Sequence, residues 1–228
     1  ENFTEKSEEG FAMKLTTQTG KINTTVTGGT YNGDVVGGSA ASGKNSAVQN
    51  ESSSLTISLT GDGTPAFKKD TRIVGGNFVS GESTSSLTTG DAGVVIDGNG
   101  KLDVASNIIG GDLIEQHSLG NVGASSKIQG TSSVTISATN FSTSEEIIGG
   151  SYVHAAGGTT ERPAAAQVGS TRVEISAGTI GGNVIGGGKV NVSELKDHEN
   201  ETYAISHVGT ANVLISGGTI NGAVIGGG

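Results

Sequence analysis

The sequence predicts an all-β protein built as a parallel β-solenoid, and three observations lead to this prediction. A short motif recurs six times, glycine occupies 40 of 228 positions, and apolar residues recur at every second position in several segments. The repeat is clearest in residues 168–188 (VGSTRVEISAGTIGGNVIGGG) and 208–228 (VGTANVLISGGTINGAVIGGG), which are identical at 14 of 21 positions. The identical residues are mainly Val, Ile, Gly and Ser, so the repetition reflects architecture rather than reactive chemistry.

The first element of each repeat is an alternating strand. Apolar side chains lie two residues apart in pairs such as Val173/Ile175 and Val213/Ile215, and polar residues separate them in several copies. A period of two places successive side chains on opposite faces of a strand. We therefore expect one face of each of these strands to be buried.

A glycine-containing corner and a second short strand come next. Glycine reaches positive φ without a Cβ clash, so segments 177–182 (AGTIGG) and 217–222 (GGTING) predict sharp bends. The second strand is the recurring motif, two aliphatic residues followed by two glycines, which we call the tag. Its first glycine is found at Gly37, Gly75, Gly110, Gly149, Gly186 and Gly226. These positions are 35–40 residues apart and indicate about six copies of one unit.

The last part of each repeat is a polar stretch of variable length, for example residues 152–167 and 189–203, where insertions are expected. Two short strands cannot bury an apolar row alone, so the units must stack. Parallel pairing of equivalent strands then aligns Val and Ile into ladders along a narrow interior. Right-handed coiling is expected, because it is the rule for parallel crossovers. The alternatives are a β-sandwich or a β-propeller, but propeller blades usually carry aromatic signatures and the chain has no Trp.

The domain organisation follows from where the tag occurs. Residues 1–19 are charged and lack the tag, so we expect an N-terminal flank or cap there, followed by a single solenoid domain over residues 20–228. The sequence stops at residues 226–228, within a repeat, and we expect the chain to be a fragment of a longer rod or one that docks end to end.

Composition limits the possible partners. Hydrophobic residues make up 32% and aromatic residues 4%, which predicts a thin aliphatic core. The absence of Cys excludes disulfides and thiolate metal sites. A net charge of -9 with 13 scattered basic residues argues against nucleic acid as a partner. The chain has no apolar run long enough to insert into a membrane as a helix.

The phrases VEISAGTIGGNVIGGG and VLISGGTINGAVIGGG resemble the β-helical passenger regions of bacterial autotransporters, which use type V secretion. The resemblance covers most of residues 20–228. It implies an extracellular or bacterial cell-surface location and a non-enzymatic role as an adhesin or stalk. The implied partner is a glycan or protein on a host or bacterial surface. The FxxN motif of polymorphic membrane proteins is absent, which sets the chain apart from that subfamily.

Two other functions remain as alternatives, a carbohydrate-active β-helix (a polysaccharide lyase or hydrolase, or a phage tailspike) and a self-assembling fibre. Enzymes that cleave glycans need carboxylates close together. The best local cluster is Asp91, Asp97 and Asp103, which flanks the turn-like segment 97–100 (DGNG), and we interpret these residues as turn-forming and solvated. We therefore predict no catalytic, cofactor or metal site.

Binding residues are expected in the variable stretches, because loops on a rigid scaffold commonly carry function. The stretches richest in functional side chains lie after the fourth and fifth tags. The candidate binding residues are Tyr152, His154, Arg162, Lys196, Asp197 and His198.

Overall fold

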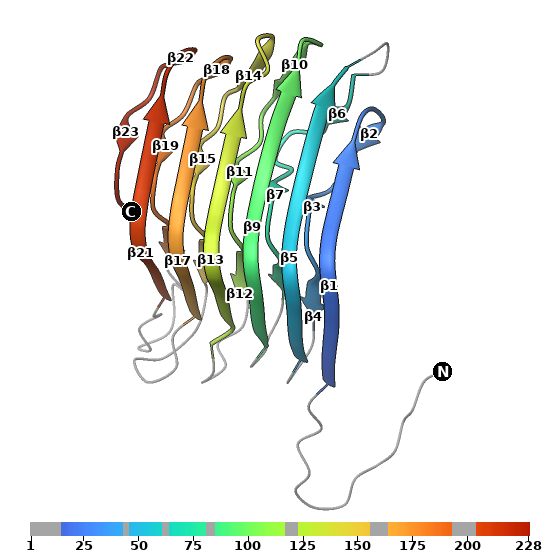
Figure 1. Cartoon of the computed structure of the whole chain (residues 1–228), viewed down its shortest axis with the longest axis vertical. Coiled ribbons are helices and arrows are strands. Elements are labelled where there is room, and N and C mark those ends of the chain that lie inside the picture. The colour runs from blue at the N-terminus through green and yellow to red at the C-terminus, as the bar shows by residue number, and fades with distance from the viewer. Residues whose placement is uncertain are drawn as a thin grey trace, which may run out of the picture.

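The computed structural model is an all-β parallel β-solenoid, which confirms the predicted fold class (Figure 1). It describes residues 15–42, 46–60, 64–80, 85–116, 123–155, 164–192 and 204–228. In these ranges every secondary-structure element is a strand, and no helix is long and apolar enough to cross a membrane.

Each turn is built from up to four kinds of strand. The long strands are β1 (Leu15–Val26), β5 (Ser46–Leu59), β9 (Ser86–Gly98), β13 (Ser125–Ile136), β17 (Ala164–Ile175) and β21 (Ala204–Ile215). The corner strands are β2 (Thr30–Tyr31), β6 (Ala66–Phe67), β10 (Leu102–Val104), β14 (Phe141–Thr143), β18 (Thr179–Ile180) and β22 (Thr219–Ile220). The tag strands are β3 (Val35–Val36), β7 (Ile73–Val74), β11 (Ile108–Ile109), β15 (Ile147–Ile148), β19 (Val184–Ile185) and β23 (Val224–Ile225). The return strands are β4 (Ala40–Ser42), β8 (Phe78–Ser80), β12 (Leu113–Gln116), β16 (Tyr152–Ala155) and β20 (Lys189–Val192).

Equivalent strands of successive turns pair in parallel and form continuous sheets. The long strands and the tag strands each form a six-stranded sheet, and the return strands form a five-stranded sheet. The corner strands divide into a pair, β2 and β6, and a four-stranded sheet that starts at β10. The six predicted repeats therefore correspond to about four complete turns and two outer ones. The four turns that contain β5, β9, β13 and β17 have a neighbouring turn on both sides.

The return strands were not predicted, because we expected polar insertions directly after each tag. The segment Tyr152–Ala155 instead pairs residue by residue with Lys189–Val192. A strand of three or four residues is too short to show a clear period of two. At the other end, β1 begins at Leu15, so the first long strand extends into the segment that we expected to flank the domain.

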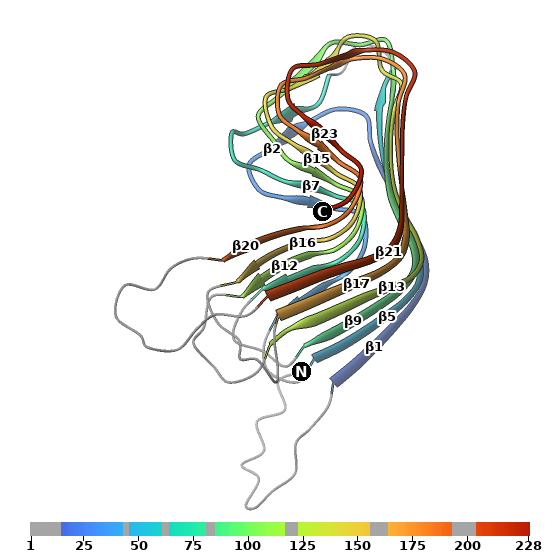
Figure 2. The same cartoon turned by 90° about the vertical axis from the view of Figure 1, so that its left-hand side faces the viewer.

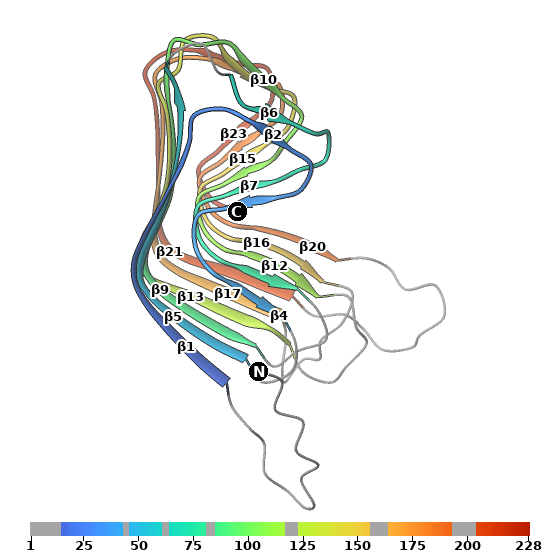
Figure 3. The ribbon, with the colours of Figure 1, turned by 90° about the vertical axis from the view of Figure 1, so that its right-hand side faces the viewer.

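The cross-section has two lobes, because each long strand bends near its middle (Figures 2 and 3). One lobe lies between the C-terminal half of the long strand and the corner and tag strands, and its core includes the ladder Leu55, Val94, Val134 and Val173. The other lobe lies between the N-terminal half and the return strand and has a core of aliphatic residues, half of them Ala. Members of this second core include Val48, Val79, Leu87, Ile114, Val153, Ala155, Ala164 and Ala166.

The tag glycines form a waist between the two lobes. A Cβ added to Gly149 would lie 2.5 Å from the carbonyl oxygen of Gly186 and 2.7 Å from Cγ2 of Val173. Hydroxyl groups of the long strands hydrogen-bond to the tag glycines at this waist. Ser132 donates to the carbonyl of Gly149, and Thr171 donates to that of Gly186. Glycine is thus required where the tag passes close to both the next turn and the long strand.

Candidate functional site

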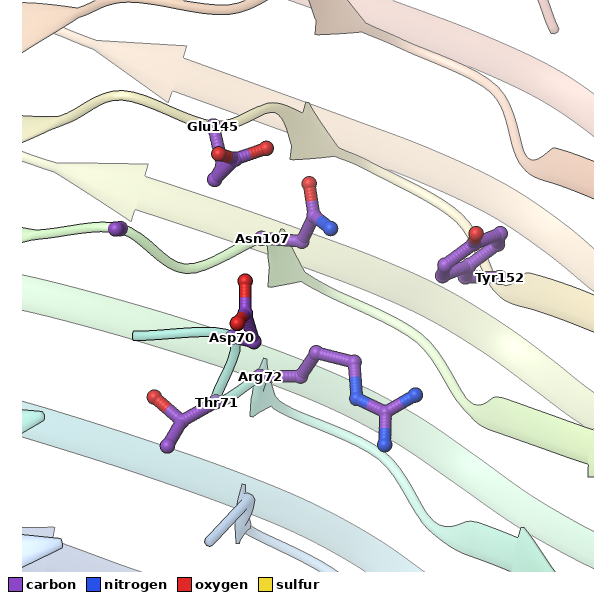
Figure 4. A pocket seen from close by; sticks show the side chains of 7 residues that line it. Asp70, Thr71, Arg72, Asn107, Glu145 and Tyr152 are labelled. Carbon is purple, nitrogen blue, oxygen red and sulfur yellow. The ribbon is translucent and has the colours of Figure 1, made fainter. Parts of the chain in front are cut away.

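An outward-facing pocket of about 210 Å³, which we call the notch, lies where segments leading into three successive tag strands meet the start of β16 (Figure 4). It is lined by Asp70, Thr71, Arg72, Ala105, Asn107, Glu145 and Tyr152. These residues come from the second, third and fourth turns, so the notch extends along the solenoid axis. Most of the residues that line it are polar or charged.

The two residues of each tag strand beside the notch pack into different apolar clusters. The first tag residue, such as Ile147, faces the interior of the first lobe. The second, such as Ile148, points out of that lobe but is fully buried, because it packs with the first residues of the return strands, including Leu113 and Tyr152. The residue before each tag is therefore left at the rim, where it can carry a polar side chain.

Arg72 is the best-anchored residue of this rim. It donates from Nε to Asp34 Oδ1 (3.1 Å) and from Nη2 to Asp34 Oδ2 (2.6 Å), and its Nη1 donates to Glu115. Burial lowers the pKa of the Arg72 guanidinium, but the carboxylates of Glu115 and Asp34 outweigh burial and raise it above its ordinary value. Arg72 therefore keeps its charge and ties together three turns.

The rim continues as a hydrogen-bonded ladder beyond Arg72. The backbone N–H of Glu146 donates to Asn107 Oδ1 (3.2 Å), and Asn183 Nδ2 donates to Glu146 Oε1 (3.0 Å). Lys189 donates to the other oxygen of Glu146, and its ammonium lies 5.5 Å from the centre of the Tyr152 ring. Tyr152 is thereby fixed in the wall of the notch.

Two carboxylates of the notch are not neutralised in this way. Asp70 and Glu145 are exposed, and their carboxylates make no hydrogen bond or ion pair with the residues that the structure describes. Asp70 has a φ of 68°, in the left-handed region, within a turn that Thr71 closes by donating from Oγ1 to the carbonyl of Lys68 (2.8 Å). This turn presents the Asp70 carboxylate at one end of the notch.

The structure brings two of the six predicted binding residues to this place. Tyr152 lines the notch, and His154 follows on the same face of β16, with Nδ1 4.0 Å from Glu115 Oε1. Arg162, Lys196, Asp197 and His198 lie outside the described residues.

Sequence reasoning missed Arg72, Asn107 and Glu145 in the notch. A usable signal existed, because Arg72 and Asn107 each directly precede a tag, and Glu145 lies one residue earlier. Residues at a constant offset from a repeated motif stack on one another in a solenoid.

The acidic cluster considered for catalysis is dispersed in the structure. Asp91 lies in the middle of β9, where its Oδ1 accepts a hydrogen bond from the backbone of Thr131 (2.7 Å), and Asp97 lies six residues further along the same strand. Six residues of extended strand span about 20 Å. Asp103 lies in the corner strand β10, where it pairs with Lys101 at 2.9 Å beside a second hollow of about 440 Å³. The three carboxylates thus do not form one site.

A buried polar ladder inside the solenoid is the second unusual feature. Ser39, Asn77, Asp112 and Ser151 follow the tag glycines of four successive turns. Asn77 donates to Asp112 from its backbone (2.6 Å) and its side chain (3.0 Å), and the backbone of Asp112 donates to Ser151 Oγ (3.1 Å). Burial raises the pKa of Asp112 to about 6, against the opposing effect of the Asn77 hydrogen bonds. This ladder is enclosed by the chain and is a structural element rather than a binding surface.

Comparison of the chain with protein-family models, with curated proteins and with solved structures finds no significant match in any of the three. A function for this chain must therefore be inferred from its fold and from the geometry of the notch.

Proposed function

We propose that this chain is a non-enzymatic binding segment of an extracellular or bacterial cell-surface protein, working as an adhesin or stalk in the manner of an autotransporter passenger. The observation that carries the proposal is the notch, an outward-facing polar pocket built on a rigid ladder of parallel strands. The resemblance of the tag repeats to passenger β-helices supports the same role.

The physical form of the molecule suits this function. Stacked Val and Ile residues that are fully buried, such as Val94, Val134 and Val173, give a stiff rod. A stiff scaffold holds recognition groups from several turns in fixed positions, so little conformational freedom is lost on binding. The rim residues are held in place by hydrogen bonds between turns. Because these residues are spread along several turns, they favour binding to a surface over catalysis at a single site.

Binding of the fluorescently labelled chain to host and bacterial cells tests the proposal. We expect saturable binding that decreases after the cells are treated with periodate, which oxidises glycans, or with protease. No saturable binding to any surface would overturn the proposal. Steady release of reducing ends from a polysaccharide, lost in Asp91→Asn, Asp97→Asn or Asp103→Asn, would instead support the carbohydrate-active alternative.

A further inference from the structure

We propose that the notch binds an amine-bearing sugar residue of an extended glycan. This inference rests on the proposed binding function and specifies its ligand. Three properties of the notch lead to it, namely its size and direction, its hydrogen-bonding groups, and its charge.

The size and direction of the notch fit one residue of a polymer. Its volume of about 210 Å³ is below the range of about 300–1,000 Å³ that is usual for pockets that enclose whole drug-sized ligands. Residues of the second, third and fourth turns line it, so a ligand that continues beyond it can lie across neighbouring turns. An extended chain with one residue seated in the notch satisfies both observations.

The free hydrogen-bonding groups suit a hydroxyl-rich ligand. A guanidinium has five N–H donors, and Arg72 uses three of them on Asp34 and Glu115, which leaves two. Asn107 accepts from the backbone N–H of Glu146 at Oδ1, and its Nδ2 makes no hydrogen bond with the described residues. Because both side chains are fixed by these contacts, they can donate to ligand hydroxyls without further ordering.

The charge of the notch selects for an amine. Arg72 is paired with two carboxylates and Lys189 with Glu146, whereas the carboxylates of Asp70 and Glu145 form no ion pair with the described residues. Asp70 and Glu145 lie on either side of Asn107 (Figure 4). A protonated amine placed between them gains two attractive interactions, whereas an acidic sugar is repelled.

The decisive experiment compares two oligomers that differ in charge and acetylation. Isothermal titration calorimetry at low salt and slightly acidic pH is carried out with the full chain, a β-1,4-linked glucosamine tetramer, and its fully N-acetylated counterpart. We expect the amine-bearing tetramer to bind at least about five-fold more tightly, as one or two partly screened ion pairs allow. Raising the salt concentration should reduce this difference.

Matched variants assign the selectivity to the notch. Asp70→Asn keeps a residue that tolerates positive φ and removes only the charge, and Glu145→Gln does the same for the second carboxylate. The double variant should lose the preference for the amine while its thermal unfolding is unchanged. Glu51→Gln removes an exposed carboxylate on the face of β5, away from the notch, and should keep the preference.

Each result decides between the inference and its competitors. Equal affinity for the two tetramers, an unchanged preference in the double variant, or an equal loss in Glu51→Gln would overturn the inference. If the chain binds cell surfaces but neither tetramer, the ligand assignment fails and the proposed function stands. If the chain binds neither cells nor tetramers, both fail.

Discussion

The backbone N–H of Asn77 donates a 2.6 Å hydrogen bond to Oδ1 of Asp112, the residue at the same position one turn further along the solenoid. Both residues are completely buried. The second oxygen of Asp112 and the hydroxyl of Ser126 are also buried. Neither makes a hydrogen bond of good geometry with a described residue, although Ser126 is near enough to lower the pKa of Asp112 slightly against the effect of burial. The fold therefore encloses an acid that it does not fully satisfy.

Replacement of this acid by its amide should stabilise the protein at neutral pH. Burial raises the pKa of Asp112 from 3.8 to about 6. As the pH rises from about 4 to 6, the unfolded chain loses this proton before the folded chain does, so the free energy of unfolding decreases. A shift of about two pK units corresponds to a penalty of up to about 3 kcal/mol above pH 6. Asp112→Asn should remove most of this penalty, because the amide can also donate to Ser126.

Urea denaturation at several pH values measures this effect. The stability difference between Asp112→Asn and the parent chain should be larger at pH 7.5 than at pH 4.5. Asn77 shows that an amide fits this column of the fold. Glu51→Gln, an exposed carboxylate on β5, serves as the control and should show no such change with pH. A difference that does not depend on pH would mean that Asp112 is not the titrating group.

The parts of the fold that could be predicted from the sequence are those that repeat in register. Pairs such as Val173/Ile175 and the tag glycines recur in nearly every unit, because each turn must present the same side chain to the ladder. A glycine near the middle of most long strands recurs as well, for example Gly169 and Gly209, but we did not recognise it. A Cβ on Gly209 would lie 2.5 Å from the carbonyl oxygen of Gly169, which explains the recurrence.

The candidate site was harder to predict, because the residue types at its rim change from turn to turn even though their positions repeat. Arg72 reaches Glu115, 43 residues later, and no other described turn has this pair. Asp70 lies between the corner strand and the tag of the second turn, and this segment is two residues longer than in the first turn. Tyr31 and Phe67, which pair with each other, therefore lie at different distances from their tags. Such contacts depend on the length of each insertion, and a single sequence does not reveal how an insertion folds.

The tag glycines should tolerate alanine only where no other atoms lie close to the added Cβ. In Gly149→Ala the new Cβ would meet the Gly186 carbonyl at 2.5 Å and Val173 at 2.7 Å, so the backbone must shift. We expect a loss of about 2 kcal/mol or more, as for other overpacked positions. Gly226 is the same tag position in the last turn, with nothing within 4 Å of its Cβ site, and Gly226→Ala should change stability by about 0.5 kcal/mol or less. Equal effects of the two changes in urea denaturation would refute the steric explanation.

Asp70 should respond to substitution according to its backbone conformation. At a φ of 68°, an alanine is strained because its Cβ lies too close to the backbone. Unlike Asp and Asn, it has no polar side chain that can offset this strain by local hydrogen bonding. Asp70→Ala should therefore cost about 1 kcal/mol, and Asp70→Asn should be nearly neutral. Thermal unfolding of the two variants checks this order. If Asp70→Asn were as unstable as Asp70→Ala, the carboxylate charge would be the stabilising feature, and Asp70 would not be available to a ligand.

Removal of Arg72 should destabilise the protein mainly through the carboxylates that it leaves behind. The side chains of Asp34 and Glu115 are 18% and 14% exposed, so each loses most of its hydration and depends on the guanidinium. Arg72→Met should cost about 1–3 kcal/mol, less than a fully buried pair because water still reaches these groups. Asp34→Asn and Glu115→Gln added to Arg72→Met should recover part of this loss, since no unpaired charge remains. Urea denaturation of the single and triple variants measures both effects. If the triple variant were less stable than Arg72→Met, the loss would not come from unpaired buried charges, and this explanation would be wrong.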